Sequence, residues 1–157
     1  MKITNVSVTL CAIEGNKIKA GVDILIDNCF AIKNIRIIES KKGGYFVAMP
    51  SAKDKSTGEF EDIVYPINQK TRDIFTDKIL NKFHQEVINL LGSLKIKKGY
   101  DLKVNLSNIH DVALVDILNN KIIDTYDLED YTTESLEELE KEVNERIESE
   151  NGRTIKN

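Results

Sequence analysis

The chain has 157 residues, of which 41% are hydrophobic and 31% are charged, and its formal net charge is −4. This length and composition are those of a globular protein with a hydrophobic core, and they favour one domain with an appendage over two full domains. No apolar run approaches the roughly 20 residues that a membrane span needs, and no signal-peptide segment is visible, so we expect a cytoplasmic protein that spans no membrane.

Charge is unevenly distributed along the chain. Residues 1–95 contain 14 Lys and Arg against 11 Asp and Glu, whereas residues 96–157 contain 8 against 15. Because the first part is mildly basic and the second is acidic, a polyanion is expected to bind the first part.

Two segments near the N-terminus show the alternation of apolar and polar side chains that is typical of β-strands. Apolar residues occupy the even positions within Val6–Leu10 and again within Ile18–Ile26. The apolar residues of the two strands can share one face only if the residue numbers of each cross-strand pair add up to an even number. This condition predicts a loop of three or five residues around Gly15. Further strands are expected at Phe30–Ile38, Tyr45–Met49 and Phe60–Tyr65, with a polar, flexible segment at Ser51–Glu59.

From about Asn68 to Leu91 the period changes to that of an α-helix. Five apolar residues follow one another at a spacing of four: Phe75, Ile79, Phe83, Val87 and Leu91. This stripe predicts an amphipathic helix that covers one face of the sheet, and Gly92 is a suitable residue for its C-terminal end.

The remaining residues predict a smaller β element and a second helix. Strands are expected at Tyr100–Leu106, Val112–Leu118 and Lys121–Ile123, and a helix at Thr132–Glu150. The expected fold class is α+β: an antiparallel β-sheet with hairpins packed by an amphipathic helix, plus a small C-terminal β-hairpin and an acidic helix. We place the domain boundary between the ranges 1–94 and 95–157.

A series of specific motifs lies between Ile35 and Phe83. They are IRII (Ile35–Ile38), GGYFVAMPS (Gly43–Ser51), GEFEDIVYPIN (Gly58–Asn68) and the Thr71-Arg72 pair that opens the helix. Over roughly its first 86 residues the sequence resembles the stage V sporulation protein G family. The resemblance implies a compact domain that forms a homodimer through its sheet, binds DNA and, as a second candidate ligand, RNA, and regulates septation and sporulation.

Five basic residues are the candidate nucleic-acid contacts, and they lie in the polar segment or in the first turns of the helix: Lys53, Lys55, Lys70, Arg72 and Lys78. Phosphate contacts need no fixed geometry, which suits lysines on a mobile loop. Arg72 is the best single candidate, because its planar guanidinium can hold a phosphate or a guanine edge. The alternative is that these are ordinary surface charges, with Arg72 paired to Asp73 or Asp77.

Catalysis finds little support in the sequence. The two histidines, His84 and His110, have no Ser, Cys or metal-ligand pattern beside them. We expect His84 to face solvent or lie near a helix end, and we infer neither an enzyme nor a cofactor or metal.

The C-terminal helix leaves several interpretations open. Residues 127–150 contain 11 Asp and Glu against 2 Lys and Arg. The helix could be a solvated surface, could compete with nucleic acid for the basic residues, or could dock on a protein partner through a narrow seam of Leu136, Leu139, Val143 and Ile147. Deleting residues 127–157 is expected to leave the second β element folded.

The sequence therefore predicts a nucleic-acid-binding regulator of septation and sporulation-type gene expression. The rival is a protein-interaction module in cell division with little affinity for nucleic acid. The rival is favoured by Ala52 and Glu61, which stand where the family often has basic residues.

Overall fold

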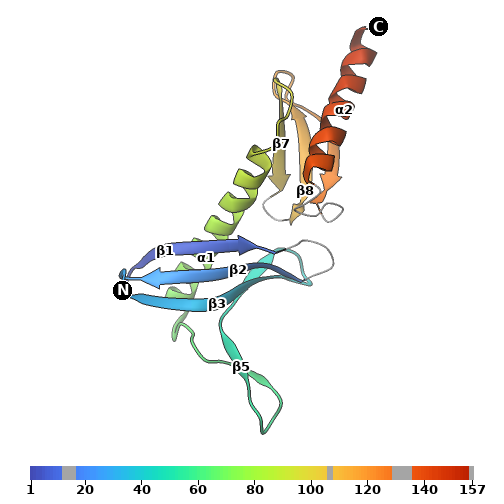
Figure 1. The fold of residues 1–157 in the computed structure, drawn as a ribbon. Helices are drawn as coiled ribbons and strands as arrows, with labels where there is room; N and C mark the ends of the chain where they lie inside the picture. The colour runs from blue at the N-terminus through green and yellow to red at the C-terminus, as the bar shows by residue number, and fades with distance from the viewer. Residues whose placement is uncertain (12–16, 106–107, 129–135, 156–157) are drawn as a thin grey trace. The chain divides into compact units, whose positions relative to one another are not determined.

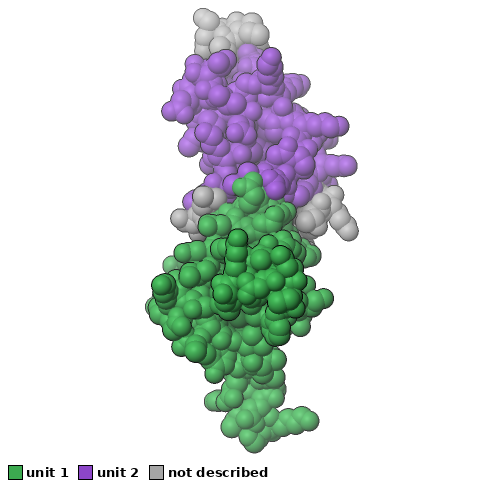
Figure 2. All heavy atoms as spheres, turned by 90° about the vertical axis from the view of Figure 1, so that its left-hand side faces the viewer, with its two compact units in different colours: residues 1–11, 16–86 green, residues 12–15, 87–157 purple. Residues whose placement is uncertain are grey.

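The computed structural model describes residues 1–11, 17–105, 108–128 and 136–155. It divides into two compact units, the first formed by the described residues up to Glu86 and the second by those from Val87 onward (Figure 2). The described residues form antiparallel sheets of four, two and three strands and two helices, which confirms the expected α+β class. The division between residues 94 and 95 stays a prediction.

The sheet of the first unit has the strand order β1-β2-β3-β4 (Figure 1). Its strands are β1 (Ile3–Leu10), β2 (Ile18–Ile26), β3 (Phe30–Glu39) and β4 (Tyr45–Ala48). Val6 lies opposite Ile24 and Val8 opposite Val22, so the expected even-sum register is confirmed. The loop around Gly15 lies outside the described residues.

A tight turn joins β2 to β3. The amide of Cys29 donates to the carbonyl of Ile26 at 3.0 Å, and the two residues between them, Asp27 and Asn28, have φ values of 48° and 55°. Positive φ at both central residues is the mark of a type I′ turn, whose twist matches that of the strands it connects.

Helix α1 (Gln69–Gly92) covers one face of this sheet (Figure 1). Phe75, Ile79 and Phe83 are at most 5% exposed, and the Phe83 ring meets the edge of the Tyr45 ring at a centroid distance of 5.4 Å. The spacing of four therefore produces the buried stripe that the sequence predicted. From Val87 onward the helix belongs to the second unit.

A two-stranded hairpin, β5 (Ser51–Lys53) with β6 (Phe60–Asp62), projects from the first unit (Figure 1). The expectation of a flexible segment over Ser51–Glu59 is wrong for its first three residues, which form a strand. The sequence gives no alternation there because every residue of both strands is exposed, so neither face is buried.

The second unit contains a three-stranded sheet, whose strands lie near the three ranges that the sequence predicted. The strands are β7 (Tyr100–Asn105), β8 (Asn108–Asp116) and β9 (Lys121–Asp127). Ile117 and Leu118 were expected to end a strand but lie in the turn instead. The reason is that the Asp116 carboxylate accepts the amides of Leu118 at 3.0 Å and of Asn119 at 3.1 Å.

Helix α2 (Leu136–Ile155) lies beside this sheet and buries an apolar seam (Figure 1). Leu139, Val143 and Ile147 have no exposed surface. The helix extends beyond the expected end at Glu150, and the expected first residues, 132–135, lie outside the described part. Within the described residues, neither α1 nor α2 is long and apolar enough to cross a membrane.

Candidate nucleic-acid interface

The β5–β6 hairpin carries the first two candidate residues. Lys53 ends β5 opposite Phe60, and Lys55 lies in the turn. The Asp54 carboxylate closes this turn, because it accepts both the amide and the hydroxyl of Ser56 at 2.6 Å. These bonds, the hydroxyl one foremost, lower the pKa of Asp54 below its ordinary value. The lysines are therefore held on a fixed turn.

The next two candidates lie in the first turn of α1. Asn68 caps the helix, since its side-chain oxygen accepts the amide of Thr71 at 2.9 Å. Lys70 is exposed and Arg72 is half-buried. Residues two apart on a helix point to nearly opposite sides, so Lys70 and Arg72 lie on different sides of α1.

The charges of these four residues are unpaired. The side chains of Lys53, Lys55, Lys70 and Arg72 make no hydrogen bond or ion pair with any residue that the structure describes. The sequence had left open a pairing of Arg72 with a neighbouring aspartate, and the structure shows none. All four cations are thus available to an anion.

Lys78 lies elsewhere in the unit. Its Nζ atom donates to the carbonyl of Ile3 at 3.5 Å, at the edge strand β1. Together with Asn81 and Lys82 it borders a cleft beside the first residues of β1. Sequence reasoning missed Lys82, although its spacing of four from Lys78 was a signal. Lys82 is less available, because it pairs with Glu86 at 2.9 Å.

A pocket on the first unit was also missed. It has a volume of about 290 Å³, and its lining includes Arg36, Phe60 and Ile63. Phe60 lies in a strand that the sequence predicted, yet its side chain is 72% exposed. The sequence signal for an exposed ring was an aromatic residue in a segment that lacks the alternation of apolar and polar side chains.

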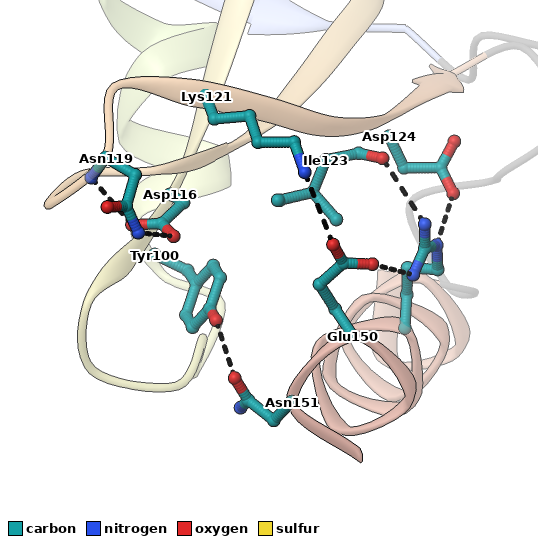
Figure 3. A network of polar contacts seen from close by, with 9 residues as sticks. Tyr100, Asp116, Asn119, Lys121, Ile123, Asp124, Glu150 and Asn151 are labelled. Carbon is teal, nitrogen blue, oxygen red and sulfur yellow. Dashed lines mark hydrogen bonds and ion pairs between the residues drawn. The ribbon is translucent and has the colours of Figure 1, made fainter. Parts of the chain in front are cut away.

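In the second unit, the acidic helix uses part of its charge internally (Figure 3). Arg146 donates to Asp124 at 2.9 Å and to Glu150 at 3.2 Å, and Lys121 lies 3.4 Å from Glu150. These contacts, led by the Arg146 hydrogen bond, lower the pKa of Glu150. The Tyr100 hydroxyl adds a bond to Asn151 at 3.0 Å.

The apolar seam of α2 is occupied within the second unit. Leu139, Val143 and Ile147 are fully buried there, as are Val112 and Leu114 of β8. The idea that this seam docks on a partner helix does not fit that burial. The charged side of α2 is the part that remains open to other molecules.

His84 does not face solvent as expected. Its Nε2 atom is buried and has no hydrogen-bond partner in the described part of the chain, and burial lowers the pKa of the imidazole. Among the described residues, no group of three or more His, Cys, Asp and Glu side chains is placed to hold a metal ion.

Comparison with known proteins gives a consistent result for the first unit. The model of the SpoVG family matches residues 1–85. A protein of Bdellovibrio bacteriovorus is 40% identical over 102 residues, which are 63% of this chain and 91% of that protein. Proteins of Caldicellulosiruptor bescii (43% over 83 residues; 53% and 91%) and Agathobacter rectalis (42% over 90 residues; 57% and 100%) are similar too. Each bears the name "Putative septation protein SpoVG".

Proposed function

Because the chain belongs to the SpoVG family, we propose that it is a cytoplasmic, non-enzymatic regulator that binds nucleic acid, DNA first and RNA as a second ligand, in septation and sporulation-type programmes. The observation that carries this proposal is a set of four cations that have no partner among the described residues and lie on the family part of the chain: Lys53, Lys55, Lys70 and Arg72. Unpaired surface cations have no internal bond to lose when they meet phosphates.

The contacts proposed are mainly electrostatic. Lys53 and Lys55 sit on a hairpin that projects from the unit, so a backbone of phosphates can reach them without rearrangement of the fold (Figure 1). Such contacts position a nucleic acid but carry little sequence information. Binding is therefore expected to weaken steeply with salt, with a slope of about −0.9 in log affinity per phosphate contacted on duplex DNA.

We also propose that the first unit forms a homodimer. An apolar groove of about 260 Å³, here called the Ile67 groove, includes Met1, Tyr65, Pro66, Ile67 and Phe75 in its lining. Ile67 is 89% exposed. Large apolar side chains that are exposed together in one patch usually mark a contact with another protein surface. The groove contains no charged side chain, which suits a second copy of this chain.

The rival function, a protein-interaction module in cell division, is supported by a different observation. Ile117, Leu118 and Ile122 at the β8–β9 turn of the second unit are 56%, 88% and 61% exposed. Glu61 on β6, opposite Ala52, would also repel a polyanion bound at Lys53 and Lys55. The rival function predicts weak nucleic-acid binding that does not depend on any one group of basic residues.

A mobility-shift assay separates the two. Random-sequence DNA and RNA should bind the full chain at about 50 mM salt and much more weakly at about 200 mM. The variant Lys53→Glu/Lys55→Glu/Arg72→Glu should lose binding but nearly keep its melting temperature, since surface charges that make no ion pair with a described residue contribute little to stability.

The control carries the same change of charge at exposed lysines without partners in the described structure, Lys41→Glu/Lys42→Glu/Lys103→Glu. It should bind almost as well as the unchanged chain. If both variants lose affinity equally, net charge and not this surface governs binding. If neither loses it, or nothing binds, the rival function is the better one.

A further inference from the structure

The pocket noted above lies on the sheet face that α1 does not cover. Ile35 and Ile37 of β3 are fully buried, and Tyr45 of β4 meets a helix side chain. Because side chains alternate along a strand, Arg36 and Phe46 point to the opposite face. The pocket on that face is here called the Arg36 pocket.

Small residues flank Arg36 on both neighbouring strands. Its register partners are Gly21 on β2 and Ala48 on β4, the two smallest kinds of side chain. Nothing lies within 4 Å of the position that a Cβ atom at Gly21 would occupy. The Arg36 side chain therefore rises from an uncovered part of the sheet.

Arg36 itself is exposed, and its guanidinium makes no hydrogen bond or ion pair with any described residue. The pocket lining combines polar residues, Asn34 and Ser51, with two exposed apolar ones: Phe60 is 72% exposed and Ile63 64%. Phe46, 47% exposed, lies across from Ile38 on the same face. Within the described structure, an unpaired planar cation and the exposed ring of Phe60 thus line the same pocket.

This combination fits one class of ligand. Aromatic rings on an open sheet stack with nucleobases, and a neighbouring arginine holds the phosphate, which is how single-stranded nucleic acid is bound with little regard to sequence. A base-paired duplex hides the faces of its bases, so it cannot stack in this way. The volume of about 290 Å³ is enough for a single base.

We propose that the Arg36 pocket is a site for single-stranded nucleic acid, in which one base stacks on Phe60 and Arg36 pairs with the adjacent phosphate. The inference rests on the proposed function and deepens it, because it names the strand state of the ligand and a second contact surface.

A second copy of the chain is the other possible occupant, and the charge of the pocket argues against it. A protein surface placed there would have to supply an acid to Arg36, whereas a nucleotide brings its own phosphate. The Ile67 groove, whose lining includes no charged side chain, meets the needs of a second copy better. The two surfaces are thus assigned to different ligands by their chemistry.

The test uses a single fluorescent reporter. The chain contains no tryptophan, so Phe60→Trp in the full chain gives one unambiguous signal. Oligo(dT) should quench this emission as bases stack, and a DNA duplex of equal length should not. Emission that instead depends on protein concentration without any oligonucleotide would identify a second copy as the occupant and overturn the proposal.

Affinity measurements complete the test. Phe60→Leu and Arg36→Gln should each weaken oligo(dT) binding about tenfold, within the range that one lost stacking contact produces, and leave duplex binding nearly unchanged. The matched control is Phe30→Leu, because Phe30 is 63% exposed and does not line the pocket. Melting temperatures should stay the same in all three.

The outcomes separate this inference from the proposed function. If the triple variant of Lys53, Lys55 and Arg72 abolishes binding while Phe60→Leu and Arg36→Gln change nothing, the pocket is not a nucleic-acid site and the proposed function stands. If no variant matters because neither strand state binds, the proposed function fails together with the inference.

Discussion

Arg146 donates to the carboxylate of Asp124 across 2.9 Å, which joins α2 to β9 (Figure 3). The same guanidinium reaches Glu150 and, at 3.5 Å, the carbonyl of Ile123. A planar group with several donors is suited to such a network, and a lysine would not reproduce it.

Arg146→Met should therefore lower the stability of the second unit. The residue is only partly exposed and anchors a network, so a loss of about 1 kcal/mol is expected, or roughly 4–8 °C in melting temperature for a domain of this size. Thermal unfolding followed by circular dichroism measures it. Lys141→Met is the control, because Lys141 and Glu145 lie 3.9 Å apart and both are well exposed. Equal effects in the two variants would contradict the assigned role.

Removal of α2 should unfold the second unit. The expectation from sequence, that deletion of residues 127–157 leaves the β element folded, conflicts with the complete burial of Leu139, Val143 and Ile147. Even Leu139→Ala should cost about 2–5 kcal/mol, since it leaves a cavity in the core. Amide exchange of β8 residues such as Val112 reports the loss. Unchanged protection in the deletion variant would show that the sheet folds without the helix.

The charge of α2 is better tested by substitution. Glu137→Gln/Glu138→Gln/Glu145→Gln changes three exposed residues and reduces the magnitude of the net charge from −4 to −1. We predict tighter nucleic-acid binding at low salt, and little change once the Debye length is about 8 Å. A Ser149→Gln variant, also on α2, controls for substitution itself. Identical affinities at all salt concentrations would rule out electrostatic competition.

The turn of the β5–β6 hairpin should depend on the ionised form of Asp54. Its pKa is lowered in the folded chain, so its contribution is present above the ordinary value of 3.8 and is lost as pH falls below that value. Asp54→Ala should remove amide protection at Ser56 at every pH. Asp77→Ala, an exposed change on α1, should not. If the Ser56 amide stays protected from exchange in Asp54→Ala, this prediction is wrong.

His84 should make the fold less stable in mild acid. Burial lowers its pKa, so the unfolded chain binds the proton more readily than the folded one. Its contribution is complete above the ordinary value of 6.5 and declines as pH falls from there through the folded-state pKa. Denaturant unfolding at pH 7.5 and 5.5 should show this decline. In His84→Gln it should be smaller, and an equal decline would assign it to other groups.

Much of the fold could be predicted because a strand or helix with one buried face has a periodic pattern of apolar residues in its sequence. β2 begins at Ile18 and ends at Ile26 as expected, since every second residue faces the core. β5 has no buried face and left no such trace. Leu118 was misplaced for a different reason, because a local carboxylate and not hydrophobicity sets the turn.

The candidate site was predictable only in part. Positive residues could be counted from the sequence, and helical geometry alone separates Lys70 from Arg72. Which cations lack partners could not be known, because that depends on the folded positions of every nearby acid. The pocket at Arg36 depends on two small neighbours from different strands, Gly21 and Ala48, and only strand register brings them together.

The order of strands in the sheets has a consequence for how the chain reaches its fold. In each sheet of the described structure, every strand pairs with its neighbour in sequence, and β2 and β3 are separated by only a few residues. Local pairing of this kind keeps contact order low and loop-closure entropy small, which favours fast folding. On the ribosome each hairpin can form soon after its second strand emerges, so the first sheet can assemble before the acidic helix has been synthesised.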